Sequence, residues 1–287
     1  MGPALNDADS GLTSSVENAH DLRRRPAFAS HTHHVRSPAM PVSEANQRSQ
    51  LDAFTDHVTA LLADPSTPHG LARTLRATAK EIALARDHQA SQKAWPNGHI
   101  DETPTHVQIG GGTHHIDGFF NIDAVPPADL LWDVREGIPL HDASVQVLFS
   151  EHFLEHIDYP HSAKHYAREA HRVLSPGGQV ITGVPDAAHV LNQYPAPPTQ
   201  AAEMIDRWYA NRTCRGDINT YLDLINYVFR DQDDDPTYNP HYWAYDAEKL
   251  TQLFAEAGFT HIEPWPFDAT IANPKREWAS IYVVATR

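Results

Sequence analysis

Four short apolar runs follow one another in the middle of the chain, and each stops at a small or acidic residue. The runs are residues 107–109, 119–122, 130–132 and 145–149. Short apolar runs bounded in this way are typical of buried strands, and open α/β sheets bind ligands outside the carboxyl ends of their strands. The pattern therefore predicts one edge of a ligand pocket, formed by the residues that follow the runs: Gly110, Gly111, Gly112, Asp123, Asp133, Ser150 and Glu151.

The types of these residues favour a nucleoside ligand. The three glycines allow a sharp turn and a close approach of the backbone, because they have no Cβ. Asp123 is placed to accept hydrogen bonds from a ribose diol, and Asp133 to accept one from an adenine amino group. No Lys or Arg lies between residues 107 and 133, and no GxxxxGK[ST] sequence occurs, so we expect an adenosine without phosphates. Each residue alone is also compatible with ordinary loop chemistry; the ordered set favours the pocket.

The region before the sheet has a different pattern. Residues 1–48 are rich in Ser, Ala, His, Pro and Asn and have little periodicity, which predicts a mobile tail. Apolar residues at helical spacing predict helices over residues 50–63 and 70–90. We expect this helical segment, residues 49–98, to serve as a lid, a brace or a dimer surface, so a homodimer is one expectation.

After the fourth run the pattern alternates between helix and strand. It predicts helices over residues 161–174 and 246–257 and strands over 179–184, 261–264 and 280–285. Residues 187–245 form an aromatic-rich insertion, which we interpret as a cap on a domain of residues 99–287. Its aromatic side chains serve either as core or as a substrate surface, through cation–π attraction. The candidates for substrate contact are Tyr209, Tyr242 and Trp243, with His241 beside them.

Composition excludes some partners. The net charge is −15, from 22 basic and 37 acidic residues, which argues against nucleic acid and against an anionic membrane surface. No apolar run approaches the length of a transmembrane helix. The single cysteine, Cys214, rules out an internal disulfide and fits a reducing compartment, so we expect a cytoplasmic location. A small-molecule partner fits these observations best.

The segment HFLEH, residues 152–156, allows two interpretations. It matches the H-x-x-E-H pattern of zinc peptidases, in which two histidines on one helix face bind the metal and the glutamate is the base. Alternatively, His152 and His156 are neutral imidazoles that accept a proton near pH 7, or they only pack locally. Asp186, after the fifth strand, is a further candidate base or substrate anchor. Our preferred interpretation places no metal in the chain.

Three segments together resemble the class I S-adenosylmethionine-dependent methyltransferases, in particular a subgroup with an HxLEH-like segment after the fourth strand. They are IGGGTHHIDGFFNID, DVREGIPLHDASVQVLFSEHFLEHI and EAHRVLSPGGQVITGVPD. The resemblance implies a doubly wound, seven-stranded, mostly parallel sheet whose last strand runs antiparallel beside the fifth. It also implies S-adenosylmethionine as cofactor, and it adds Val134 and His152 to the pocket residues named above as cofactor contacts.

One departure from the family concerns the first crossover. Only ten residues separate Gly112 from Asp123, whereas a helical crossover needs a dozen or more. The first helix is therefore expected to be vestigial or missing, and the methionine end of the cofactor to be held differently. We expect methyl transfer to a small molecule. The alternatives are transfer or cyclisation of the aminocarboxypropyl arm, a zinc hydrolase acting through HFLEH, and a non-catalytic cofactor-binding protein.

Overall fold

The computed structural model describes residues 44–95, 104–194, 198–209, 218–230 and 240–287. Contacts divide the chain into Met1–Gln47 and Arg48–Arg287. Of the first unit only residues 44–47 are described, so most of the predicted tail, residues 1–48, lies outside the described residues. The second unit holds the sheet. Among the described residues, no helix combines the length and apolar character needed to cross a membrane.

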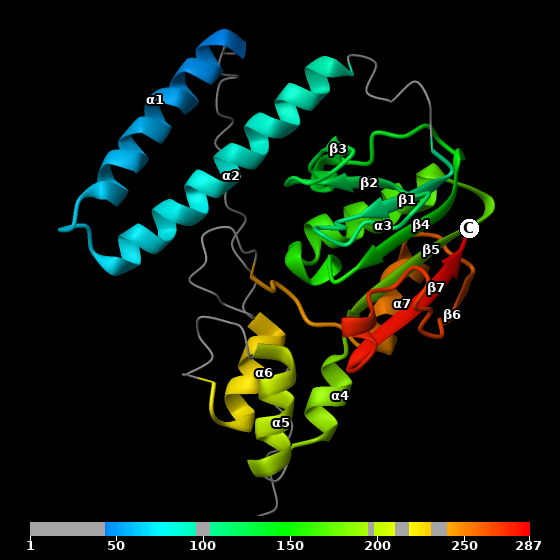
Figure 1. Ribbon diagram of the computed structural model, residues 1–287. Coiled ribbons are helices and arrows are strands. Elements are labelled where there is room, and N and C mark those ends of the chain that lie inside the picture. The colour runs from blue at the N-terminus through cyan, green and yellow to red at the C-terminus, as the bar shows by residue number, and fades with distance from the viewer. Residues whose placement is uncertain (1–43, 96–103, 195–197, 210–217, 231–239) are drawn as a thin grey trace, which may run out of the picture. The chain divides into compact units, whose positions relative to one another are not determined.

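The sheet has seven strands in the order β3-β2-β1-β4-β5-β7-β6 (Figure 1). All neighbours pair in parallel except β7, which runs antiparallel to both β5 and β6. The predicted α/β fold, with its seven strands and its antiparallel last strand beside the fifth, is confirmed. The strands are β1 (His106–Ile109), β2 (Phe120–Asp123), β3 (Leu130–Leu131), β4 (Val145–Glu151), β5 (Leu174–Pro185), β6 (His261–Pro264) and β7 (Ser280–Thr286).

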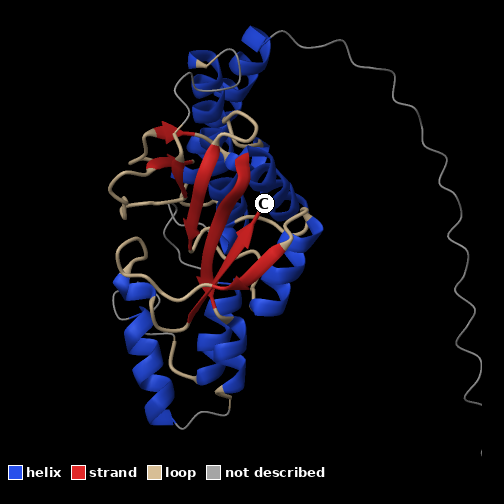
Figure 2. Ribbon diagram, turned by 90° about the vertical axis from the view of Figure 1, so that its right-hand side faces the viewer, coloured by secondary structure: helices blue, strands red, loops and turns tan. Residues whose placement is uncertain are grey.

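Helices α3 (His161–Val173) and α7 (Ala247–Glu256) pack together against the β5–β7 side of the sheet. The apolar stripe of α3 includes Ala163, Tyr166 and Ala170, and all three are fully buried in the main core. Asp246 caps α7, because its Oδ1 accepts a hydrogen bond of 2.8 Å from the Lys249 backbone N–H. Figure 2 shows the strands as one twisted layer with helices beside it.

No helix forms between β1 and β2, as the short spacing predicted; the connection consists of turns. The buried side chain of Gln108 holds it. Its Nε2 donates to the His114 carbonyl at 2.7 Å, and its Oε1 accepts from the Ile116 N–H at 3.2 Å. Ile116 thereby packs with Phe149 and Tyr282 in a second cluster. Because Phe149 belongs to β4 and Tyr282 to β7, the connection between β1 and β2 packs against the sheet through Ile116.

Two long helices precede the sheet. Helix α1 (Glu44–Ala63) begins six residues before the predicted start at residue 50, so residues 44–48 are helical rather than part of a tail. Glu, Ala and Gln at its start are good helix formers. Helix α2 (His69–Ala94) follows it, and an ion pair between Arg86 and Asp52 joins the two helices. The Ser91 hydroxyl of α2 donates to the Leu131 carbonyl at 2.6 Å, which fastens α2 to the edge of the sheet.

The described residues of the aromatic-rich insertion form three helices with a core of their own. They are α4 (Ala187–Asn192), α5 (Pro198–Tyr209) and α6 (Tyr221–Arg230). They lie together beyond the end of β5 (Figure 1). A separate cluster joins them through Val190, Ile205 and Leu224, which are at most 2% exposed. The described part of the insertion is therefore a packed helical unit rather than an irregular loop.

The role of the Gln108 amide in holding the connection between β1 and β2 can be tested by mutation. We expect Gln108→Leu to lower the free energy of unfolding by about 1–3 kcal/mol, because two backbone groups lose their partner in a mostly buried place. Urea unfolding followed by fluorescence measures the change. The exposed Gln179→Leu on β5 is the matched control and should change stability little. Equal effects of the two variants would contradict the role of Gln108.

Candidate functional site

An open cleft lies at the carboxyl ends of β1 and β2, where the sequence predicts a pocket. It has about 550 Å³ of empty space, a figure that includes space open to solvent. Of the predicted residues, Gly110, Asp123, Asp133, Val134, His156 and Tyr242 line it. The remaining lining comes from Glu81, Leu84, Ile109, Ile122, Ala124, Trp132, Arg135, Phe153 and Ile157.

The glycine turn allows neighbouring side chains to pack closely against its backbone. Gly110 and Gly112 have φ angles of 68° and 54°, in the left-handed region that favours glycine. A Cβ on Gly110 would lie 2.8 Å from the Phe153 ring, and one on Gly111 would lie 2.7 Å from Oδ1 of Asn121. Gly110 therefore opens the cleft floor beside Phe153, and Gly111 lets the turn pack on β2.

Asp123 ends β2 and faces the cleft, as predicted. Its Oδ2 accepts a hydrogen bond from the Gly112 N–H at 2.9 Å, and its Oδ1 accepts one from the Val125 N–H at 3.2 Å. Burial raises the pKa of this carboxyl, and the backbone donors lower it only in part. Because each carboxylate oxygen has two lone pairs, Asp123 retains capacity to accept from a ligand.

Asp133 lines the cleft but already has a strong partner. The Arg135 guanidinium donates to both of its oxygens, at 2.7–3.0 Å. Arg135 also binds Glu81 of α2, with an Nη2–Oε2 distance of 2.8 Å. These two carboxylates raise the pKa of Arg135. The predicted contact of Asp133 with an adenine amino group would therefore share an oxygen with Arg135.

The predicted Ser-Glu pair points away from the cleft, and neither residue lines it. Ser150 is fully buried, and its Oγ lies 3.1 Å from Oγ1 of Thr182. The carboxylate of Glu151 accepts from the Tyr282 hydroxyl at 2.6 Å and from Arg276 at 3.1 Å. Successive strand residues face opposite sides of a sheet, so the side chains of Ser150 and Glu151 lie on opposite faces.

His152 follows β4 with a φ of 51°. Its Nε2 lies 2.8 Å from the Ser280 hydroxyl, and its Nδ1 lies 3.6 Å from Oε1 of Glu155. Burial, and then the charge of Arg276, hold the pKa of His152 well below its usual value, so the ring is neutral at pH 7. The 3₁₀ turn η2 begins only at Leu154, and the helix that the zinc-peptidase pattern requires does not form.

The side chain of His156 lines the cleft, and its ring contacts a residue that is distant in sequence. Its ring lies 4.8 Å from the ring of His241, centroid to centroid, and the Glu155 carboxylate is close to both. The backbone N–H of Tyr242 donates to the Glu155 carbonyl at 2.7 Å, which holds the chain after residue 239 against η2. His241 and Glu155 are buried, at 8% and 2% exposure.

The remaining residues predicted for the site lie in different parts of the structure. Asp186 caps α4, because its Oδ1 accepts from the Ala188 N–H at 2.9 Å, and it does not line the cleft. Tyr242 is half exposed at the cleft. Trp243 stacks on Tyr159, with ring centroids 4.8 Å apart. Tyr209 ends α5, and its side chain lies outside the described residues.

Helix α2 and Arg135 also contribute to the cleft, and neither contribution was predicted from the sequence. Glu81 and Leu84 reach the cleft from a helix that begins far from the strand ends. The helical spacing predicts a helix over residues 70–90, but it does not indicate what that helix contacts. Arg135 lies just beyond residues 107–133, where basic residues are absent. It pairs with acidic side chains, so it does not by itself indicate a phosphate site.

One family of known proteins matches part of the chain. Residues 125–182 match the family described as "Methyltransferase domain". This segment runs from just after β2 into β5, and it includes the 3₁₀ turn η1 (Val134–Glu136), β4 and η2 (Leu154–His156). No curated protein matches the chain.

Solved structures of low similarity add context. A methyltransferase of Thermotoga maritima, described as a possible histamine N-methyltransferase, is 16% identical, over 75% of this chain and 96% of its own, with a TM-score of 0.38. The 1,6-didemethyltoxoflavin-N1-methyltransferase of Burkholderia thailandensis, solved with S-adenosylhomocysteine, is 12% identical over 89% and 98%, with a TM-score of 0.36.

The contact between Gly110 and Phe153 can be tested with a matched pair. Gly110→Ala and Gly112→Ala both place a side chain at positive φ, which costs about 1–2 kcal/mol. Only the first also meets Phe153, so we expect it to lose about 1–3 kcal/mol more through overpacking. Thermal and urea unfolding measure both losses. Equal losses would show that Phe153 moves aside freely.

Proposed function

We propose that this chain, a class I S-adenosylmethionine-dependent methyltransferase, transfers the methyl group of that cofactor to a small-molecule acceptor. The methyltransferase-domain match over residues 125–182 and the sheet order with its antiparallel β7 support the enzyme class and the cofactor. The acceptor class rests on the cleft at the ends of β1 and β2 and on a net charge of −15, which disfavours nucleic acid.

The observation that supports the proposal most is the cleft at the ends of β1 and β2. Its floor is a glycine turn, and its rim bears the Asp123 carboxylate. We assign Asp123 to the ribose hydroxyls, because its oxygens face the cleft and can each accept a second hydrogen bond. Trp132, Val134 and Ile157 supply the apolar walls that an adenine ring requires.

The reaction is an in-line displacement at the methyl carbon. The bond from carbon to the positive sulfur breaks as the bond to the acceptor forms, and the sulfur keeps the electron pair. The protein contributes alignment and exclusion of water. His156 is at the cleft and His152 is neutral behind it, so an imidazole that accepts the acceptor's proton is available near the site.

Two further parts of the chain bear on this function. Residues 49–98 act as a brace in our proposal, because α2 closes one wall of the cleft through Glu81 and its ion pair with Arg135. Residues 187–245 act as the cap. Tyr242 meets the cleft, and Trp243 stacks beside it on Tyr159. Their exposed ring faces suit contact with an acceptor or with the sulfonium.

Analysis of the cofactor products tests the proposal. The protein is incubated with S-adenosylmethionine carrying a deuterated methyl group and with a library of small amines, hydroxyl compounds and thiols. Mass spectrometry should find S-adenosylhomocysteine together with one acceptor that has gained the labelled methyl group. Methylthioadenosine as the main product would instead indicate use of the aminocarboxypropyl arm. Neither product, despite cofactor binding, would contradict enzyme function.

The role of Asp123 gives a separate prediction. Asp123→Ala removes a charge-assisted acceptor for the ribose hydroxyls, worth on the order of 1.5–3 kcal/mol, so the affinity for S-adenosylhomocysteine should fall tenfold or more. Titration calorimetry measures it. The exposed Asp117→Ala removes the same charge in the nearby turn and serves as the control. Wild-type affinity in Asp123→Ala would exclude the assignment.

A further inference from the structure

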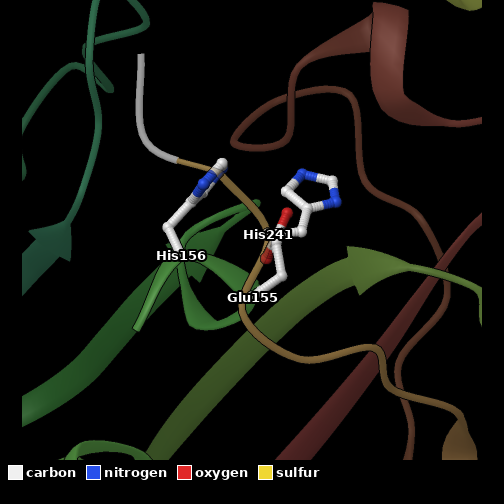
Figure 3. A group of neighbouring side chains, drawn as sticks. All are labelled: Glu155, His156 and His241. Carbon is white, nitrogen blue, oxygen red and sulfur yellow. The ribbon is translucent and has the colours of Figure 1, made fainter. Parts of the chain in front are cut away.

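Three side chains from two distant segments converge behind the cleft (Figure 3). They are Glu155 and His156 of η2 and His241, and one ligand atom from each lies within 4.8 Å of the others. In the view of Figure 3 the carboxylate lies between the two imidazoles. Glu155 and His241 are buried, while His156 also lines the cleft. A carboxylate and two imidazoles are brought together at one point where the sheet edge meets the insertion.

The support around these side chains is that of a metal site. Nδ1 of His241 lies 2.8 Å from the Val228 carbonyl of α6. Because a carbonyl can only accept, Nδ1 carries the hydrogen, and Nε2 presents a lone pair. Ligand histidines in metal sites are oriented in this way by a backbone carbonyl. The hydrogen bond from the Tyr242 N–H to the Glu155 carbonyl ties the backbone of Glu155 to the residue that directly follows His241.

We propose that Glu155, His156 and His241 bind one divalent first-row transition metal ion, with zinc or iron(II) as the class that two imidazoles and one carboxylate prefer. At metal–ligand distances of about 2.1 Å, tetrahedral ligand atoms are about 3.4 Å apart. Side-chain rotations that move the ligand atoms by roughly an ångström bring them from their present spacing to the tetrahedral one. This site differs from the zinc-peptidase pattern: His152 is not a ligand, and Glu155 is a ligand rather than a base.

The position of His156 gives the ion a function in the reaction. With three protein ligands, further coordination positions stay open, and His156 directs the site towards the cleft. Resting on the proposed function, the inference extends to the acceptor: a hydroxyl or carboxylate oxygen that binds the metal. Bound there, the ion would lower the pKa of an acceptor hydroxyl. Because His156 is then a ligand, the hydroxyl proton would leave to solvent, and the oxygen would take the methyl group as the sulfur–carbon bond breaks.

Titration of the full-length protein with Co²⁺ tests the site without any need for activity. Before titration a chelator strips the protein, and dialysis then removes the chelator. Wild type should bind one Co²⁺ tightly and show the visible absorption of a nitrogen- and oxygen-ligated ion. His241→Asn and Glu155→Gln should each weaken this binding on the order of tenfold or more. If either variant fails to fold, the partly exposed His156→Asn decides the matter in its place.

Controls separate this site from other histidines. The chain has 20 histidines, so a variant with His31, His33 and His34 replaced by Asn should retain the tight Co²⁺ site, and so should the exposed His57→Asn. Unchanged affinity in His241→Asn and His156→Asn would overturn the proposal, as would loss of the tight site with the tail histidines. Calorimetry with S-adenosylhomocysteine on the metal-free protein tests cofactor binding separately, so the two proposals can fail independently.

Discussion

The backbone pairing of β1 with its two neighbours is the constraint on which the site depends. Ile109 pairs with Ile122 of β2 and with Ser150 of β4, so the three strands end at the same level. The glycine turn, Asp123 and the start of η2 are adjacent only because of this register. A slip of one residue would turn every side chain of a strand to the opposite face. The full burial of Val107 and Ile122 makes such a slip costly, since it would carry these side chains out of the core.

Strand register also explains which parts of the site could be predicted from the sequence. Apolar runs that end on small or acidic residues locate the edge of the sheet, and Gly110 and Asp123 do lie at the cleft. The same pattern does not say which face a residue just inside the edge will take. Ser150 and Glu151 were therefore predicted as cofactor contacts. In the structure Ser150 lies against Thr182 on one side, and Glu151 accepts a hydrogen bond from Tyr282 on the other.

Contacts made across long sequence separations were beyond prediction for another reason. Arg135 belongs to the cleft because Glu81 and Asp133 both bind it, and nothing local in the sequence of α2 marks Glu81 as its partner. Asp186 was a reasonable candidate base, since it follows β5. The observed cap on α4 accounts for it instead, because Asp at an N-cap is common and stabilising. Local rules give the type of an element; they do not give the partner of an exposed charge.

The absence of a helix between β1 and β2 changes how the two ends of the cleft are built. In the described residues the turn after Gly112 is tied back to Asp123 by the Gly112 N–H, so a carboxylate that lines the cleft also holds the glycine turn. A helix N-terminus would have supplied free N–H groups at this point, whereas the Gly112 N–H is already bound to Asp123.

The segment that reaches the rim from the far side is residues 240–243. Its backbone is tied to Glu155, and the ring of His241 is tied to Val228 on α6. Val228 in turn belongs to the cluster that holds α4, α5 and α6 together. The ring of His241 lies against His156, and His156 lines the cleft. A continuous chain of contacts therefore connects the helical core of the insertion with the cleft, although the residues involved are far apart in sequence.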